Sequence, residues 1–354
     1  MIPMLPTVRF LRCALMLICA CLVVPSQAAT TALPFETVGQ KLDLSKLANR
    51  TDDPDAPVVY YTSAINAQAL LDLYKALGRQ AHGRVAVKIS TGEAGNTHYL
   101  SPQLIGPLVK SVNGTIVECN TAYGGARAST ESHLKLAAEH GFTEIAQVDI
   151  MDAEGSLSLP VAGGTYLKED LVGSHLSNYD FVMVLSHFKG HAMGGYGGAL
   201  KNISIGIAST SGKHLIHSAG HSRDNAWGYN QGAYTRNHSD EHMEFIYAMA
   251  EAAKAVIDFE DHGARMLYIN VLNHLSVDCD CDGSPSAPDM HDIGMIASVD
   301  PVAADQAGLD LIWAAPDSAS LKERVASRRG PGVLKHAEEL GLGRSTYRLV
   351  SLDK

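Results

Sequence analysis

Short apolar runs alternate with amphipathic stretches along most of the chain. Val58–Tyr61 is a compact apolar run, and residues 66–77 follow it with alanine and leucine at helical spacing, ending before Gly78. Residues 180–185 are apolar on both faces, which is typical of a buried strand. In chain order the pattern predicts strands at 58–61, 84–89, 114–119, 145–151, 180–185, 266–272, 293–298 and 347–351. It predicts helices at 66–77, 101–112, 129–140, 241–257 and 301–313, with two more helices before the last strand.

Strands that alternate with helices and are apolar throughout predict an α/β fold. Its sheet would be mainly parallel, with helices on both faces. Long Gly- and His-rich loops interrupt the pattern, chiefly residues 186–239, and residues 273–292 form a polar loop. In such folds the loops after the carboxyl ends of the strands build the functional site. We therefore expect the candidate site residues to lie in these loops.

The first 28 residues have the pattern of a secretory signal peptide. Arg9 and Arg12 form the positive region, Cys13–Val24 is unbroken apolar sequence, and small residues precede a cleavage point after Ala28. The alternatives are a membrane anchor, for which the run is short of the roughly 20 residues needed, and a lipoprotein signal, which Ile18–Cys21 loosely resembles. The sequence therefore predicts a periplasmic or secreted protein with no membrane span after cleavage.

Removal of the signal would change the charge and the cysteine count. Taking Arg9 and Arg12 from the 28 basic residues leaves 26 against 38 acidic residues, a net charge of −12. This balance argues against nucleic acid and anionic membranes as partners. Residues 29–57 would form a polar lead-in, and residues 58–354 a single α/β domain. Cys119, Cys279 and Cys281 would remain, an odd number that does not form a disulfide scaffold.

The segment 186–202 follows a buried strand and combines glycines with charged side chains. Glycines let the backbone approach a ligand and present its N–H groups to an anion. The candidate cofactor-binding residues here are Gly194, Gly195, Gly197, Gly198 and Asn202. Lys189 and Lys201 could neutralise the anion, and His187 and His191 could move protons or ligate a metal, which makes these four the candidate catalytic residues. The alternative is a tight turn with hydrogen-bonded histidines.

Two cysteines one residue apart lie in an acidic loop, Asp278–Gly283, with Asp292 further along. A disulfide within Cys-x-Cys is strained, whereas two thiols flanked by carboxylates suit a soft transition metal. The candidate metal ligands are Cys279, Cys281, Asp292 and His187. A solvated acidic loop, or a disulfide from one of these cysteines to Cys119, is the alternative.

Two further groups are weaker candidates. Five histidines lie at 214, 217, 221, 238 and 242. The pairs 217/221 and 238/242 have the i,i+4 spacing that would place both rings on one face of a helix. The Ser/Gly/Asn content around the first pair predicts a loop instead, and surface histidines without a role are the alternative for the group. The segment 120–127 follows a strand and contains Asn120, a glycine pair and Arg127, which would suit a substrate carboxylate or phosphate, although a plain turn explains it equally well. Lys88 could join the same site.

Three groups of residues together resemble the domain of unknown function 362 family, whose members are often labelled uncharacterised iron–sulfur centre proteins. They are the segments from Val85 to Gly125, the stretch 187–202, and Asp278–Cys281 leading to Asp292–Ala303, so the resemblance spans residues 58–315. The positions that match are His187, Lys189, His191, Lys201, Asn202, Cys279, Cys281, Asp292 and Asp300.

The resemblance implies an iron–sulfur centre, which this sequence does not support. Many relatives carry a ferredoxin-type insert after the Gly-rich motif, but residues 209–240 contain no cysteine. Three cysteines cannot supply the four thiolates of a cubane cluster within one chain. The family has no settled activity to carry over.

The leading hypothesis is therefore an exported metal-dependent or redox-linked enzyme that acts on a small anionic substrate. Cys279, Cys281 and a histidine would bind a transition metal, His187 or His191 would act as acid and base, and the lysines would hold the anion. The alternatives are a non-catalytic protein that binds a small ligand, and a partner subunit of a ferredoxin-like redox protein.

Overall fold

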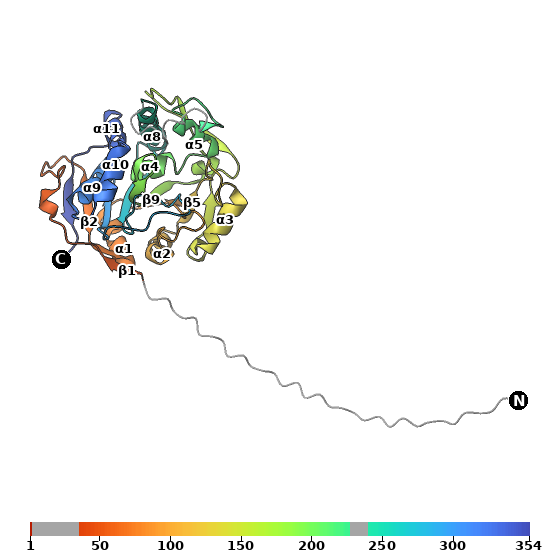
Figure 1. Cartoon of the computed structure of the whole chain (residues 1–354), viewed down its shortest axis with the longest axis horizontal. Helices are drawn as coiled ribbons and strands as arrows, with labels where there is room; N and C mark the ends of the chain where they lie inside the picture. The colour runs from red at the N-terminus through yellow and green to blue at the C-terminus, as the bar shows by residue number, and fades with distance from the viewer. Residues whose placement is uncertain (2–34, 227–239) are drawn as a thin grey trace. The chain divides into compact units, whose positions relative to one another are not determined.

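The structure is a computed structural model that describes Met1 and residues 35–226 and 240–354. The predicted signal peptide, apart from Met1, and His238 lie outside the described residues. The described chain has an α/β fold with a central sheet and helices on both of its faces (Figure 1), which confirms the predicted fold class.

The central sheet contains eight strands among the described residues. From one edge to the other they are β14 (Arg348–Ser351), β2 (Val58–Thr62), β13 (Gly294–Ser298), β12 (Met266–Leu272), β9 (Phe181–His187), β4 (Val85–Lys88), β5 (Thr115–Glu118) and β6 (Val148–Ile150). Neighbouring strands from β12 to β6 are parallel, as are β14 and β2. Only β13 runs antiparallel to its neighbours in this sheet, so the sheet is mainly parallel, as predicted.

Both faces of the sheet are covered because successive strand residues point to opposite sides. In β9, Phe181, Met183 and Leu185 pack against α1 (Ala67–Ala76) and α2 (Pro102–Ser111). Val182 and Val184 belong to the cluster on the other face, together with α8 (Asp240–Phe259) and α9 (Pro301–Ala314). This two-sided burial explains why the strand is apolar throughout.

Polar caps and prolines set the helix starts that the sequence predicted. The side chain of Asn66 accepts the amide hydrogen of Ala69 at the start of α1. Ser101 caps α2, Ser129 caps α3 (Thr130–Glu139) and Asp300 caps α9. Proline occupies the first turn of α2 and of α9, where its missing N–H is not needed.

The Gly- and His-rich region is not the continuous loop that the sequence predicted. Within residues 186–226 it forms a hairpin of β10 (Lys189–His191) and β11 (Gly195–Gly197), followed by α4 (Ala199–Ser204) and α5 (Thr210–His217). Outside this region, the structure has two more antiparallel strand pairs that were not predicted. They are β1 (Glu36–Val38) with β3 (Ala64–Asn66), and β7 (Ser156–Pro160) with β8 (Glu169–Gly173).

The last two predicted helices are α10 (Ala319–Ser327) and α11 (Gly332–Glu339). Short 3-10 turns lie at Leu44–Lys46, Phe142–Glu144 and Ser174–Asn178, the second of them just before β6. Among the helices that the structure describes, none has the length and apolar character needed to cross a membrane.

Candidate functional site

A cavity of about 440 Å³ lies where β4, β5 and β9 end. Three separate stretches of chain line it: residues 88–127, residues 186–217 and the cysteine loop 278–283. Because parallel strands end at one edge of the sheet, their following loops converge there. The sequence-predicted residues that line the cavity are His187, His191, Lys201, Asn202, Arg127, Gly197, Gly198, Cys279 and Cys281.

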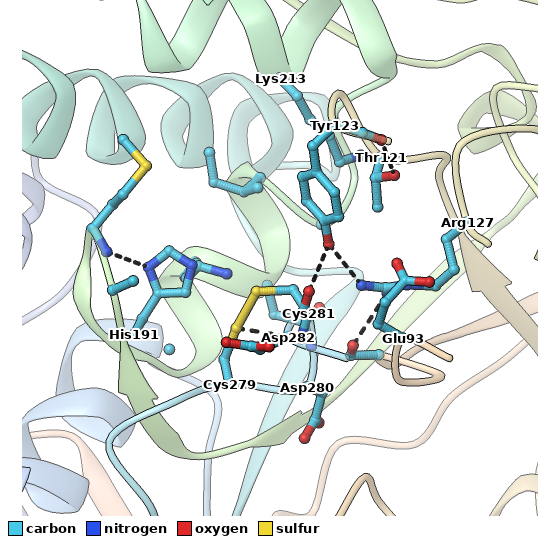
Figure 2. Close-up of a pocket in the computed structure, with 18 of the residues that line it drawn as sticks. Glu93, Thr121, Tyr123, Arg127, His191, Lys213, Cys279, Asp280, Cys281 and Asp282 are labelled. Atoms are coloured by element: carbon cyan, nitrogen blue, oxygen red, sulfur yellow. Dashed lines mark hydrogen bonds and ion pairs between the residues drawn. A yellow bond between two sulfur atoms is a disulfide. The ribbon is translucent and has the colours of Figure 1, made fainter. Parts of the chain in front are cut away.

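The two cysteines of the acidic loop are joined to each other by a disulfide, with their Cα atoms 5.3 Å apart. Figure 2 shows the disulfide in the cavity wall, facing His191. The expectation that strain would favour separate thiols is wrong for this structure. The pairing of one of them with Cys119 is also excluded here, since Cys119 is a free thiol, buried and donating to the carbonyl of Ile207. Burial raises the pKa of Cys119 to about 12.

Asp280, the residue between the cysteines, is buried and points away from the disulfide (Figure 2). Its carboxylate is 3.1 Å from Lys189 Nζ and 3.0 Å from His187 Nδ1. Burial alone would raise its pKa, but the charges of His187 and Lys189 lower it to about 2. Asp280 of the cysteine loop thus forms a buried ionic cluster with His187 and Lys189.

This contact changes the roles predicted for His187 and Lys189. Besides Asp280, His187 uses its other ring nitrogen, Nε2, on the carbonyl of Asn273 at 2.7 Å, so neither nitrogen is available to a metal. Lys189 does not line the cavity and is only 1% exposed, so it does not reach a ligand there. Both side chains contact Asp280 of the cysteine loop.

Neighbouring loops hold the rest of the cysteine loop by its backbone. Asn96 donates to the carbonyl of Asp282 at 2.9 Å, and the hydroxyl of Tyr123 donates to the carbonyl of Cys281 at 3.1 Å. Arg324 of α10 donates to the carbonyl of Val277 at 2.6 Å. With this many fixed contacts, the two sulfurs are held in one orientation toward the cavity.

His191, at the end of β10, has a defined hydrogen-bonding state. Its Nδ1 accepts the amide hydrogens of Gly194 at 2.8 Å and Met193 at 3.2 Å. Since Nδ1 therefore carries a lone pair, the proton of the neutral ring lies on Nε2. Burial, followed by the charge of Lys201, lowers the pKa of His191 well below its usual range, so the ring is neutral. One ligand atom each from His191, Cys279 and Cys281 lie within 4.8 Å of one another.

The Gly-rich segment forms only part of the predicted anion cradle. Gly197 and Gly198 line the cavity, but Gly194 and Gly195 do not. The first amides of α4, those of Ala199 and Leu200, donate to the buried carboxylate of Asp305 at 2.6 and 3.0 Å. A ligand anion therefore has no access to them.

Lys201 extends from α4 into the cavity, and no residue in the described part of the chain pairs with its ammonium group. Burial lowers its pKa to about 8, and the charges of Lys88 and Arg127 act in the same direction. At neutral pH most of the population still carries the charge. The next residue, Asn202, is tied to the protein because its side chain accepts from Lys88 at 3.0 Å and donates to Ser186 at 3.1 Å.

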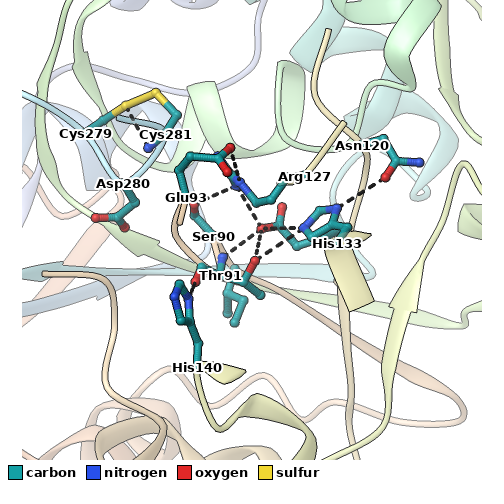
Figure 3. Close-up of polar contacts among 12 residues, drawn as sticks. Ser90, Thr91, Glu93, Asn120, Arg127, His133, His140, Cys279, Asp280 and Cys281 are labelled. Atoms are coloured by element: carbon teal, nitrogen blue, oxygen red, sulfur yellow. Dashed lines mark hydrogen bonds and ion pairs between the residues drawn. A yellow bond between two sulfur atoms is a disulfide. The ribbon is translucent and has the colours of Figure 1, made fainter. Parts of the chain in front are cut away.

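Glu93 and Arg127 lie across the cavity from His191 (Figure 2), and they belong to a buried ionic network that Figure 3 shows in part. Glu118 pairs with Lys88 at 3.1 Å and with Arg127 at 3.4 Å, and Arg127 also pairs with Glu93 at 3.3 Å. Burial would raise the pKa of Glu118, but the charge of Lys88, the hydrogen bond from His133 and the charge of Arg127 hold it well below its usual range. Arg127 is thus at the predicted site, but its guanidinium group is already engaged.

The remaining predicted residues lie away from the cavity. Asn120 donates to Thr130 at 3.0 Å and does not line the cavity. Asp292 accepts from the backbone of His274 at 2.8 Å and from Thr37, and it is not part of the cluster around the cysteines. The predicted ligand set of Cys279, Cys281, Asp292 and His187 is therefore not assembled.

The sequence interpretation missed α5 and its cavity-lining residues. His214 and His217 lie in this helix and are buried, so the loop prediction is wrong for His217, and neither residue is a surface histidine. His242 is also buried, within α8. Lys213 of α5 lines the cavity, and its ammonium group donates to the carbonyl of Ala208. The signal that was available was the apolar pair Leu215–Ile216, which follows the Ser209 cap within the same short segment.

The chain belongs to the family described as Domain of unknown function (DUF362), which matches residues 85–310. No curated protein matches it significantly. Among solved structures, it is similar to the lactate racemase apoprotein from Thermoanaerobacterium thermosaccharolyticum, with 15% identity, a TM-score of 0.38, and coverage of 74% of this chain and 59% of the other. A protein from Thermotoga maritima has 14% identity, a TM-score of 0.42, and coverage of 72% and 58%. The chain thus spans about three fifths of the length of these structures.

The iron–sulfur label of some family members does not fit the residues of this site. A cubane cluster needs four thiolates. The described part of the chain has three cysteines, of which two are bonded to each other and the third donates to a backbone carbonyl.

Proposed function

We propose that this chain is a redox-linked enzyme in which the Cys279–Cys281 pair exchanges two electrons with a small anionic substrate. The observation that carries the proposal is that the disulfide and the unpaired ammonium group of Lys201 line the same cavity. A ligand held by Lys201 would lie next to the sulfurs.

The reaction class follows from the chemistry of a disulfide. The substrate gives up two electrons and two protons, the sulfur–sulfur bond breaks, and each sulfur becomes a thiol. The disulfide of a redox partner protein then accepts the same two electrons and two protons by thiol–disulfide exchange, which restores the bond. This cycle includes the redox partner that the sequence hypothesis allowed.

The hydrogen-bonding state of His191 supports this chemistry. Since its Nδ1 accepts two amide hydrogens, its Nε2–H is the group free to donate. An N–H donor beside a sulfur stabilises the thiolate that forms when the disulfide opens. His191 would act as this donor, while Asp280, His187 and Lys189 keep the loop in place.

We also propose that the protein is exported. The signal pattern of residues 1–28 is the basis, and a disulfide in a cavity wall supports it, since disulfides persist in oxidising compartments. A fusion of residues 1–40 to a reporter enzyme that is active only outside the cytoplasm would test this. Loss of reporter activity on Leu15→Arg/Leu17→Arg is expected, because these changes break the apolar region.

Thiol counting tests the redox proposal directly. The protein is alkylated in its native compartment, purified, and analysed by mass spectrometry before and after titration with dithiothreitol buffers. We expect Cys279 and Cys281 to react together, only after reduction, in one two-electron transition. The matched control is Cys119→Ser, which should leave the transition unchanged because Cys119 is not part of the pair. Free, unmetallated Cys279 and Cys281 in the untreated protein would contradict the proposal.

A metal centre is the second candidate, favoured by the ligand atoms of His191, Cys279 and Cys281 within 4.8 Å. Two thiolates and a histidine with one open position are a ligand set of catalytic zinc. This candidate requires reduction of the disulfide, and a histidine ligand normally donates from its other ring nitrogen. Here that nitrogen accepts amide hydrogens, so the hydrogen bonds of His191 would have to change.

Elemental analysis of protein prepared anaerobically separates the two candidates. One equivalent of a transition metal that is lost in Cys279→Ser/Cys281→Ser would favour the metal centre. No metal together with a reversible disulfide would favour the redox enzyme. Binding of a small ligand without either a bound metal or a reversible disulfide would favour the non-catalytic binding protein.

A further inference from the structure

Most charges in the cavity wall cancel within the protein. Lys88 pairs with Glu118, and Arg127 lies between Glu118 and Glu93, so two cations face two anions. In the cysteine loop, Asp280 pairs with Lys189 and Asp278 with Arg324 at 3.1 Å.

Two cations of the wall have no such partner. Neither Lys201 nor Lys213 has an acidic group within ion-pair distance in the described part of the chain. Lys213 is buried, and its ammonium donates to a backbone carbonyl, which does not neutralise the charge. His191 and His217 beside them are neutral, because burial lowers the pKa of both, that of His217 to about 4. Asp282, at the outer end of the cysteine loop, is exposed and screened by solvent. Burial lowers the pKa of Lys213 as it does that of Lys201. The inner wall thus holds two lysine side chains that have no acidic partner in the described part of the chain.

Apolar side chains also line the cavity. Ala192 and Met193 come from the turn of the β10–β11 hairpin, Ile205 follows α4, and Ala122 follows β5. A cavity of about 440 Å³ is much larger than an inorganic anion and falls in the range that holds a small organic ligand. These side chains would contact a hydrocarbon portion.

We infer that the cavity binds an organic dianion, with a doubly charged head such as a phosphate monoester between Lys201 and Lys213 and an apolar body against Met193 and Ile205. The inference rests on the proposed function in placing the ligand beside the cysteine pair, and it names the class of ligand. Lysines suit this head because they act as point charges and set no bidentate geometry.

Calorimetric titration of the purified oxidised chain tests the inference with three probes: phenyl phosphate, inorganic phosphate and benzoate. Phenyl phosphate should bind at least tenfold more tightly than inorganic phosphate, which lacks the apolar body, and than benzoate, which carries one charge. Equal binding of benzoate, or of inorganic phosphate, would overturn the inference.

Substitutions of Lys201 and Met193 test which residue contacts the charged head of the ligand and which contacts its apolar body. Lys201→Met should weaken phenyl phosphate at least tenfold, and Lys201→Arg should restore most of the affinity because the charge returns. The matched control is Lys110→Met on the exposed surface of α2, which should bind as the parent does. Met193→Ala should weaken phenyl phosphate and leave inorganic phosphate unchanged. Unaltered binding in Lys201→Met, with the fold intact by circular dichroism, contradicts the inference.

The double variant Cys279→Ser/Cys281→Ser distinguishes this inference from the proposed function. It should bind phenyl phosphate within about threefold of the parent, since the charge that holds the head comes from the two lysines and not from the sulfurs. If binding is normal but the parent shows no reversible disulfide, the redox proposal fails and the ligand class stands. If the disulfide cycles but no dianion binds, the ligand class fails and the redox proposal stands.

Discussion

At the scale of single residues, the site depends on a buried group of charged side chains that pair with one another. Asp280, Lys189 and His187 are buried together under the cysteine loop. Buried charges are tolerated only when they are paired, so each of them depends on the others. His187 and Lys189 stood out in the sequence because they lie in the Gly-rich segment 186–202, but in the structure they contact Asp280, about 90 residues further along the chain.

Asp280→Asn should therefore destabilise the protein, because it leaves the Lys189 ammonium buried without a counter-charge. Removal of one partner of a buried pair costs about 3–5 kcal/mol. Urea denaturation would measure the free energy of unfolding of Asp280→Asn, Lys189→Met and the double variant. We expect the double variant to be more stable than the sum of the single losses allows, and strict additivity would contradict the pairing.

Asp170 of β8 predicts a pH dependence of stability. It is fully buried, and neither of its carboxylate oxygens has a partner in the described part of the chain. Burial raises its pKa from 3.8 to about 7. From pH 4 to pH 7 the unfolded chain loses this proton while the folded chain keeps it, so the contribution of Asp170 to stability falls as pH rises. Each pKa unit corresponds to 1.36 kcal/mol, so the loss is on the order of a few kcal/mol above pH 7.

Asp170→Asn should remove this dependence, since asparagine stays neutral. Melting temperatures between pH 4 and pH 9 should show a gain over the parent at pH 8 that shrinks toward pH 4. The exposed Asp72→Asn is the control and should shift the curve little. A constant difference at all pH values would show that Asp170 is ionised in the folded protein.

At the scale of elements, the strands and most helices were predictable from the sequence because their signals are local. Apolar runs, caps and prolines mark β9, α2 and α9 within a few residues. The pattern failed at α5, where serine, glycine and histidine suggested a loop, although Ser209 caps the helix and Leu215 and Ile216 pack into the core. Tertiary burial outweighed the weak local propensity.

The cavity itself was predicted only in part. Lys201, His191 and the cysteines were marked because they stand out in the sequence, and the structure places them together. Nothing local could show that Asp280 would capture His187 and Lys189, since they lie 93 and 91 residues from it in the chain. Asp305 likewise occupies the amides of α4 from about a hundred residues away.

Gly190 in β10 links the hairpin to the cysteine loop. A Cβ at this position would lie 2.4 Å from the carbonyl oxygen of Val277, so Gly190→Ala should push the hairpin and the loop apart. We expect a lower melting temperature and easier reduction of the disulfide. Gly124→Ala is the matched control in the same cavity wall, since a Cβ there meets nothing within 4 Å. A fully stable Gly190→Ala with an unchanged disulfide would contradict this packing.

At the scale of the whole molecule, the sheet depends on a strand near the end of the chain. β14 pairs with β2 at the sheet edge, and Asp353 beyond it accepts hydrogen bonds from Thr62 and Ser63. β2 in turn pairs with β13, the antiparallel strand next to β12. The end of the chain therefore protects strands that lead to the cysteine loop.

Deletion of residues 348–354 should leave β2 as an exposed edge. An unprotected edge strand promotes association between molecules. We expect a lower melting temperature and concentration-dependent aggregation by light scattering. The control Lys354→Ala, at the exposed end of the chain, should behave as the parent. A truncated chain that stays monomeric and equally stable would mean that β14 contributes little.

The hydroxyl of Tyr123 donates to the carbonyl of Cys281 across 158 residues of sequence and accepts from Arg127 at 3.0 Å. Contacts between such distant segments form late in folding, because the entropy of closing the long intervening segment must first be overcome. During synthesis the wall around Tyr123 leaves the ribosome well before Cys279 and Cys281 do. The two cysteines would therefore come together while the cavity is still incomplete. An oxidant could then form the disulfide before the cavity is able to hold a ligand.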